Sequence, residues 1–313
     1  MRIIVTSSRA RDAGIALLSA IALALAFPKA NLPWLAPFGA AGLFWLWQGH
    51  SWKRALWTGW LAGAVFIALS FSWVTNTVGS ELGSLSFLVV LIIALLEGAF
   101  FGLAGVGAAL AYRCAPLWAA PLAASAAFVA FEWARSVGTL GVPFEQLGYS
   151  QADTPLAVFA AYVGTYGVSF VLCIIGAYLA SALARERRRD LAIALVVIAC
   201  AWTLAYAAWP ARHAAAPSIR VAAIQGNIAQ TIKMQAGSSA IAIRRYVNLT
   251  RRARAFAPAL VLWPETVITT FTENDPALMA RFATLARTMH ATLVLGSWDL
   301  HDRRAYNALY VFG

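Results

Sequence analysis

The chain has 313 residues, of which 61% are hydrophobic and only 12% are charged. A soluble domain carries about a quarter charged residues, so this composition excludes an ordinary globular protein. The net charge of +11 does not indicate nucleic-acid binding, because the positive residues are dispersed between apolar segments. The composition instead predicts a protein that crosses a membrane several times.

Apolar stretches fill the chain up to about residue 209. A membrane-spanning helix needs roughly 20 mostly apolar residues, so the length of each stretch indicates whether it can cross a membrane. The first stretch also resembles a signal peptide, but further spans follow it at once, so we expect it to be retained. The second is short and flanked by proline, so we expect it to be tilted or only partly spanning. In chain order, the seven predicted spans are residues 12–28, 34–49, 55–75, 84–112, 117–135, 156–184 and 190–209.

The positive residues between these spans predict the orientation. Short cytoplasmic loops carry more Lys and Arg than loops on the other side. With a cytoplasmic N-terminus, the outside segments contain only Lys29, Arg135 and Arg212. An odd number of spans then places everything after Trp209 outside the cytoplasm, which is the periplasm in a bacterium. The inside segments contain Arg2, Arg9, Arg11, Lys53, Arg54, Arg113, Arg185, Arg187, Arg188 and Arg189.

After Pro217 the pattern becomes that of a globular protein. Predicted strands alternate with predicted helices, which is typical of an α/β layer structure. Four strands make only half of such a domain, so we expect the chain to be incomplete relative to its natural fold. The predicted domains are a transmembrane helical domain at 1–212 and a partial α/β domain at 218–313. The predicted strands are 219–225, 259–263, 292–297 and 305–312, and the predicted helices are 239–256 and 276–290.

Three ionisable residues lie in or beside the predicted spans. An ionisable group such as Glu97 is costly inside a membrane, so it is either a functional residue or a partnered one that faces other helices. Glu132 and Arg135 are three residues apart and share a helix face, so they can pair. We expect this pair to anchor the loop at Gly141–Gln151 rather than to perform chemistry.

The apolar run Leu260–Trp263 leads directly into Pro264 and Glu265. The proline ends the strand, so Glu265 is placed at the carboxyl edge of the sheet, where open α/β sheets bind their ligands. A poorly solvated carboxylate beside a tryptophan is suited to act as a general base. Taken alone, the same pattern also fits a solvated glutamate in a loop.

Several short motifs, taken in chain order, support a more specific interpretation of both predicted domains. Those of the α/β part resemble the carbon–nitrogen hydrolase (nitrilase) superfamily, whose domain is an α-β-β-α sandwich. Those of the membrane part resemble bacterial apolipoprotein N-acyltransferase. The first set is Gln225–Gly226–Asn227, Trp263–Pro264–Glu265, Gly296–Ser297 and Tyr306–Asn307; the second is Ser72–Trp73–Val74, Phe131–Arg135, Gly141–Phe144 and Leu147–Gln151.

The resemblance implies transfer of an acyl chain from a membrane phospholipid to the N-terminal amine of a diacylglyceryl-cysteine lipoprotein, through a thioester on a cysteine. Glu265 matches the general base of this family. The family's oxyanion-stabilising lysine and its cysteine lie past the position of Gly313, so we expect residues 1–313 to be inactive alone. Lys233 is not at the lysine position, and Met234 stands where the family tends to have a tryptophan.

Further expectations concern the surroundings of the reaction. We expect a monomer in the bacterial inner membrane, with no cofactor, no metal and no nucleic acid, and we expect Cys114, Cys173 and Cys200 to be packing residues. Two alternatives stay open, namely a membrane-tethered amidase of the nitrilase type and a non-catalytic scaffold or transporter. The residues expected to face substrate or lipid are Trp73, Tyr149, Gln151, Gln225, Trp263 and Asn307.

Overall fold

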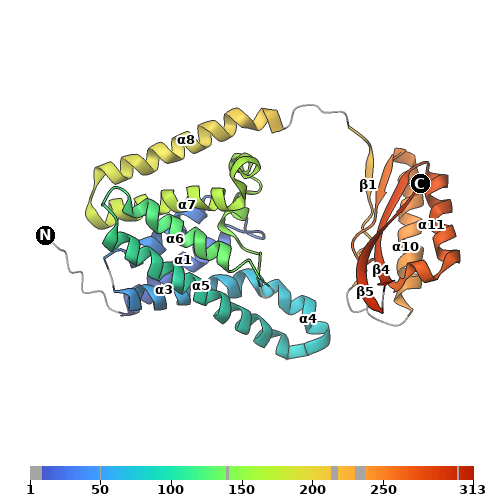
Figure 1. Cartoon of the computed structure of the whole chain (residues 1–313), viewed down its shortest axis with the longest axis horizontal. Coiled ribbons are helices and arrows are strands. Elements are labelled where there is room, and N and C mark those ends of the chain that lie inside the picture. The colour runs from blue at the N-terminus through green and yellow to red at the C-terminus, as the bar shows by residue number, and fades with distance from the viewer. Residues whose placement is uncertain (1–8, 50, 139–140, 213–217, 230–236, 302) are drawn as a thin grey trace. The chain divides into compact units, whose positions relative to one another are not determined.

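The computed structural model describes residues 9–49, 51–138, 141–212, 218–229, 237–301 and 303–313 (Figure 1). The contacts within the chain divide it into two compact units, Met1–Ala214 and Ala215–Gly313, each of which is described by itself. The expectations for Lys233 and Met234 lie outside the described residues.

The first unit is helical, and a helix overlaps each of the seven predicted spans. Four helical stretches are long and apolar enough to cross a membrane, namely Trp52–Gly79, Gly83–Cys114, Pro155–Arg185 and Arg188–Trp209. Helix α2 has only 13 residues, in agreement with the short second span. The helices are α1 (Arg9–Leu25), α2 (Leu35–Trp47), α3 (Trp52–Ser70), α4 (Val74–Leu82), α5 (Ser86–Cys114), α6 (Ala120–Ala134), α7 (Ala160–Arg185) and α8 (Arg188–Arg212).

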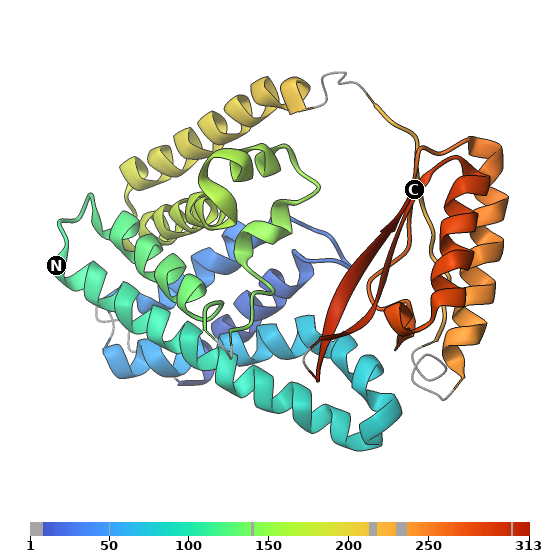
Figure 2. The ribbon, with the colours of Figure 1, turned by 45° about the vertical axis from the view of Figure 1, so that its right-hand side comes forward.

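Small residues allow α3 and α5 to pack closely. A Cβ at Gly59 would lie 2.5 Å from the carbonyl oxygen of Phe101, and one at Gly98 would lie 2.9 Å from the backbone of Ala64. Glycines at such spacing let apolar helices approach where lipid provides no hydrophobic drive. Helix α5 has 29 residues, or about 43 Å at 1.5 Å per residue. Figure 2 shows its first turns and α4 projecting beyond the neighbouring helices.

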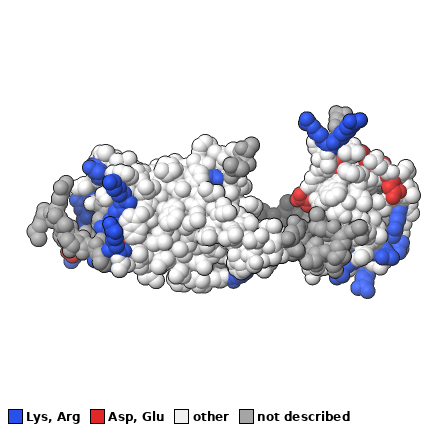
Figure 3. Space-filling view, turned by 90° about the horizontal axis from the view of Figure 1, so that it is seen from below, with Lys and Arg blue, Asp and Glu red and all other residues white. Residues whose placement is uncertain are grey.

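Charged side chains mark one end of the helical unit. Lys and Arg gather at that end in Figure 3, and most of the side of the unit in this view shows no charge. Near the starts of these two helices, Arg54 of α3 forms an ion pair of 2.5 Å with the buried Asp12 of α1. Arg11 lies over the ring of Trp45. The apolar belt with charge at one end is what a helical unit in a membrane requires.

The second unit contains a five-stranded sheet. Strands β1, β2 and β4 pair in parallel in that order, and β5 pairs antiparallel with β4. Strand β3 was not predicted from the sequence. It is a strand of four residues that lies parallel to the second half of β4, which runs four residues beyond the predicted end. The strands are β1 (Val221–Ala223), β2 (Leu260–Leu262), β3 (Ile268–Phe271), β4 (Thr292–His301) and β5 (Arg304–Phe312).

Two helices, α10 (Ser238–Ala253) and α11 (Pro276–Met289), cover one face of this sheet (Figure 1). Their apolar side chains form a core with Val261, Leu293 and Leu295 of the strands. Among the described residues of this unit, no helix covers the opposite face (Figures 1 and 2). That face carries the exposed apolar side chains Val221, Leu300, Leu309 and Val311. The expected fold class, a bundle of apolar helices followed by an α/β unit, is confirmed.

Candidate functional site

Glu265 lies in the gap between two short strands that share one neighbour. Strand β2 pairs with β4 at Thr292–Val294, and β3 pairs with it at Ser297 and Trp298. The chain between β2 and β3 stays on the same edge of β4, since Trp263 donates its backbone N–H to Val294 and Val267 to Gly296. The carboxyl edge predicted for Glu265 is therefore a short loop held between two strands.

Gly296 of β4 makes room for this loop. A Cβ at this position would lie 2.6 Å from the backbone nitrogen of Thr266 and 2.7 Å from Cα of Glu265. Thr266 adopts a positive φ of 48°, a conformation that costs energy for a β-branched residue. The close approach and the strained turn fix the direction of the Glu265 side chain.

Asn307 of β5 holds the carboxylate. Its Nδ2 donates a hydrogen bond to Glu265 Oε1, and its Oδ1 accepts one of 3.0 Å from Thr266 Oγ1. The structure thus brings together two of the residues selected from the sequence. Glu265 is exposed in this chain, so the expected poor solvation beside a tryptophan is not observed. The reason is that the side chain of Trp263 points to the other side of the sheet.

Trp263 belongs to the core rather than to a lipid-facing surface. Its side chain is buried, packs against Tyr246 and Phe282, and donates from Nε1 to Thr250 Oγ1 at 2.9 Å. The alternation of side chains along β2 places it on the helix-covered face. Gln225, which follows β1, is exposed.

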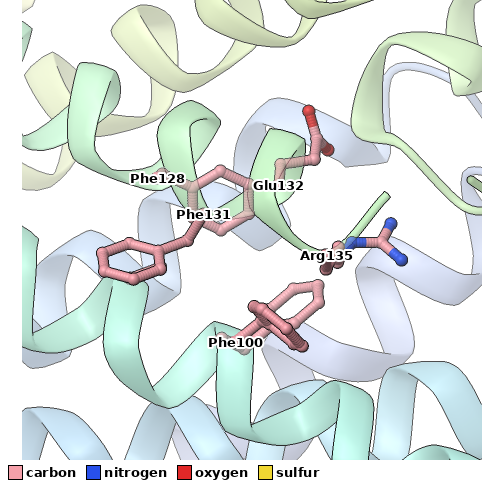
Figure 4. Close-up of a pocket in the computed structure, with 7 residues that line it drawn as sticks. Phe100, Phe128, Phe131, Glu132 and Arg135 are labelled. Atoms are coloured by element: carbon pink, nitrogen blue, oxygen red, sulfur yellow. The ribbon is translucent and has the colours of Figure 1, made fainter. Parts of the chain in front are cut away.

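A second cluster of polar residues holds the α6–α7 loop (residues 141–151). Arg135 donates from Nη1 to Glu97 Oε2 at 3.2 Å and from Nη2 to the carbonyl oxygens of Phe144 and Glu145 at 2.7 and 2.8 Å. Its side chain is only 1% exposed. Glu132 accepts the backbone N–H of Leu147 at 2.6 Å. Figure 4 shows the charged ends of Glu132 and Arg135 directed away from the rings of Phe100, Phe128 and Phe131.

This arrangement decides which carboxylate forms an ion pair with Arg135. Arg135 forms its ion pair with Glu97 of α5 and not with Glu132. The sequence spacing allowed the Glu132 pair, but the chain turns after α6, and Arg135 bonds the returning backbone instead. Glu97 is accordingly a partnered residue inside the bundle. Glu132 and Arg135 both anchor the loop, as expected.

Glu145 is a third carboxyl beside this guanidinium. Its backbone has a positive φ of 56°, and its Oε2 is buried without a hydrogen-bond partner. Burial raises the pKa of the Glu145 carboxyl, and the Arg135 guanidinium opposes the shift. Strained residues of this kind are often found where a loop has a functional shape.

The loop residues selected from the sequence differ in their surroundings. Tyr149 is 44% exposed. Gln151 is only 2% exposed, and its Nε2 donates to the carbonyl oxygen of Pro33 at 2.9 Å. Gln151 therefore supports the loop from inside, contrary to the expectation that it faces lipid. A buried amide is stabilised when it forms such a hydrogen bond.

An aromatic strip, made of Phe71, Trp73 and Phe144, joins this loop to the end of α3. The ring of Phe71 lies 6.0 Å from that of Phe144 and 6.2 Å from that of Trp73, between centroids. Phe71 is buried, whereas Trp73 and Phe144 are 43% and 53% exposed. Phe144 was not selected from the sequence, although it ends a quoted motif, because only the loop conformation shows that its ring is exposed.

Neither cluster has the composition of a metal site. The described residues contain no group of three or more His, Cys, Asp or Glu side chains that could hold an ion. Cys173 is buried, and Cys114 and Cys200 are exposed on α5 and α8. The two clusters, one on membrane-length helices and one at a sheet edge, define the chain as an integral membrane protein with an α/β domain.

Comparison with known proteins identifies the family. Residues 19–178 match the apolipoprotein N-acyltransferase N-terminal domain. The chain is 31% identical over 307 residues to the apolipoprotein N-acyltransferase of Methylococcus capsulatus, covering 96% of this chain and 60% of the relative. It is 26% identical to that of Coxiella burnetii, covering 96% and 63%. The chain belongs to the apolipoprotein N-acyltransferase family and spans about 60% of the length of these relatives.

Proposed function

We propose that this protein takes part in lipoprotein maturation by transferring an acyl chain from a membrane phospholipid to the N-terminal amine of a diacylglyceryl-cysteine lipoprotein. The observation that carries the proposal is the family match. The family model covers residues 19–178 of the helical unit, and the alignment with the Methylococcus capsulatus relative covers 96% of this chain. Both substrates carry acyl chains, which is consistent with an enzyme that lies in the membrane.

The proposal includes an arrangement in the bacterial inner membrane. The seven apolar helices α1, α2, α3, α5, α6, α7 and α8 cross it, with the N-terminus in the cytoplasm and residues 218–313 on the periplasmic side. The gathering of Lys and Arg at one end of the helical unit supports this orientation (Figure 3). The protein acts as a monomer and needs no cofactor or metal.

The α/β unit is proposed to be the first part of a nitrilase-like α-β-β-α sandwich. Its single layer of helices and its exposed apolar sheet face support this assignment. An apolar sheet face is stable only when another layer covers it. A second sheet on Val221, Leu309 and Val311 would complete the sandwich and would also reduce the exposure of Glu265.

Glu265 is the proposed general base of the reaction, and Asn307 is proposed to orient it. A base that takes the proton from a thiol allows the thiolate to accept the acyl chain as a thioester, and the lipoprotein amine then displaces it. None of the three cysteines is assigned as the nucleophile, because all three belong to the helical unit, with Cys173 buried in the bundle, Cys114 on α5 and Cys200 on α8, whereas Glu265 belongs to the α/β unit. Trp73, Tyr149 and Gln225 are proposed to contact substrate.

The full product of the gene tests this proposal in membranes that contain labelled phospholipid and a diacylated lipoprotein. We expect Glu265→Gln to lower N-acylation by at least about 100-fold, the usual contribution of a general base. Asn307→Ala should lower it less, because the carboxylate remains. Unchanged transfer by Glu265→Gln would contradict the assigned base, and hydrolysis of small amides in place of transfer would favour the amidase.

Residues 1–313 produced alone provide a second test. We expect no N-acylation from them, because we infer from the family resemblance that its lysine and its cysteine lie outside residues 1–313. Correct folding would be checked by the thermal unfolding of the purified chain. Measurable transfer to the lipoprotein by residues 1–313 would show that a nucleophile within them had been overlooked.

A further inference from the structure

The proposed function leaves open why a charged network is buried behind the α6–α7 loop. We propose that Arg135 is a positioning residue for the phospholipid donor, because its guanidinium fixes the loop that displays Phe144 and Tyr149 to the acyl chains. This inference rests on the proposed function. It assigns a role in donor binding to a residue that reaches no surface itself.

Stability alone does not explain a buried arginine at this position. Removing a guanidinium and a carboxylate from water is costly, and apolar replacements of buried ion pairs are often neutral or stabilising. Arg135 and Glu97 are nevertheless almost fully buried, and aromatic rings such as Phe101 surround them. A task that apolar side chains cannot perform is therefore expected here.

That task is to bind several backbone carbonyl groups of the α6–α7 loop at once. The guanidinium contacts the carbonyl oxygens of Val142, Phe144 and Glu145, at 3.4, 2.7 and 2.8 Å. Arginine carries several donors in a rigid planar fork, so it holds such a curved segment in one shape. Lysine, a single point charge on a flexible stem, does not reproduce this geometry.

The bound carbonyls determine where two exposed rings lie. The left-handed backbone of Glu145 follows Phe144 directly, and the ring of Phe144 packs edge-on against Phe71. Past Glu145, the Glu132 carboxylate and the Ser169 hydroxyl accept the N–H groups of Leu147 and Gly148. Tyr149 follows and is exposed. The segment from Phe144 to Tyr149 is thus fixed at its start by Arg135 and towards its end by Glu132 of α6 and Ser169 of α7.

Glu97 gives the guanidinium its direction. It lies on α5, whereas Arg135 directly follows α6, so the ion pair connects the loop to a different helix. Without the carboxylate, the positive charge would be buried and uncompensated, and the side chain would be free to turn toward Glu132 or Glu145. We expect Glu97 to act through Arg135 and not through the donor.

The test measures donor contact directly. The complete protein is reconstituted with a phospholipid that carries a photoactivatable diazirine in its acyl chain, and cross-linked peptides of residues 141–151 are quantified by mass spectrometry. We expect Arg135→Lys and Arg135→Gln to lower cross-linking by at least about tenfold, the factor for loss of one hydrogen bond to a charged group. Glu97→Gln should act in the same direction but less strongly.

The Asp12–Arg54 pair provides a matched control. It is also an ion pair with a buried carboxylate between two helices, but it lies near the starts of α1 and α3 and contacts no part of the α6–α7 loop. Arg54→Gln should lower the thermal unfolding temperature and leave loop cross-linking unchanged.

Steady-state kinetics of acyl transfer provide a second measurement. Arg135→Lys should raise the KM for the phospholipid and leave the KM for the lipoprotein unchanged.

The outcomes separate this inference from the proposed function. If the unaltered protein transfers acyl chains and its loop cross-links, but Arg135→Lys cross-links equally well, the positioning role is overturned. Transfer without any cross-link to the loop would also overturn it and leave the acyltransferase intact. Absence of transfer by the unaltered protein would contradict the proposed function itself. If Arg54→Gln lowered loop cross-linking as much as Arg135→Gln, the loss would be a general structural effect and the positioning role would be overturned.

Discussion

Glu265 and Arg135 each lie just beyond a regular element, and the side chain of each forms hydrogen bonds with another segment, but their surroundings differ. Glu265 is exposed and has one oxygen held by Asn307. Arg135 is buried, and its donors reach a carboxylate and three carbonyls. The first arrangement leaves a carboxylate available to a reactant, whereas the second uses a charge to shape the backbone. Side-chain charge thus has a chemical use at the sheet edge and an architectural use in the bundle.

The strongest way to test this comparison is to remove the partner of the buried charge. We expect Glu97→Ala to lower the free energy of unfolding of the helical unit by about 3–5 kcal/mol, because Arg135 would remain buried without a counter-ion. Thermal and denaturant unfolding in detergent would measure this loss. Glu186→Ala, at an exposed glutamate after α7, is the control. A loss as small as that of the control would show that Arg135 does not depend on its ion pair.

The stability of the cluster formed by Glu265, Thr266 and Asn307 at the sheet edge should depend on close packing rather than on charge. Gly296→Ala places a Cβ against the backbone of Thr266 and Glu265, and overpacking of this kind costs about 1–3 kcal/mol. Hydrogen exchange of the β4 amides in the whole chain would report the loss. Gly14→Ala is the control, since its Cβ would meet no atom within 4 Å. Unchanged exchange in β4 would mean that the Glu265 loop is not tightly held.

A smaller effect is expected beneath the same loop. Thr250→Val removes the acceptor for Trp263 Nε1 and leaves a buried donor unpaired, which costs about 1–2 kcal/mol. The measurement is again hydrogen exchange, now of β2 and α10. Thr288→Val, on the exposed face of α11, should change little. Equal effects at the two threonines would argue that Trp263 is not the support of the Glu265 loop.

The smallest expected effect concerns acidity in the α/β unit. A hydrogen bond with Asp299 raises the pKa of the Glu273 carboxyl above its ordinary value of 4.5. A raised pKa in the folded state favours the protonated form, so the stabilisation is present below the unfolded value and is lost as pH rises through the folded value. The protection of the β4 and β5 amides against hydrogen exchange, corrected for the intrinsic rise of exchange with pH, should therefore fall over that rise. Glu273→Gln should remove the dependence, and its persistence would place the titrating group elsewhere.

Much of the fold could be predicted because the signals are local. An apolar run of 20 residues, or an apolar strand followed by Pro264, carries its own physical consequence regardless of the rest of the chain. Strand β3 could not be predicted in this way. Its four residues are extended because β4 continues far enough to pair with them, and that pairing depends on residues about 30 positions away.

The candidate site shows the same division. The sequence selected Glu265 and Asn307, because each stands at a strand end or in a strand of a recognisable order. It also identified Glu97, Glu132 and Arg135 as unusual, because charge is rare in apolar segments. The ion-pair partner of Arg135 could not be predicted, since helical spacing describes one helix and the partner is on another.

The sequence by itself determined the apolar helices, the α/β unit that follows them and the residues able to carry charge or chemistry. Only the tertiary structure decided which of those residues are exposed. Trp263 packs into the core beneath the sheet, and Gln151 is buried with a hydrogen bond to the Pro33 carbonyl, while Phe144 is exposed although its carbonyl accepts a hydrogen bond from the buried Arg135. The composition and hydrophobic periodicity of a segment specify its secondary structure, whereas the exposure of its side chains depends on which elements pack against it.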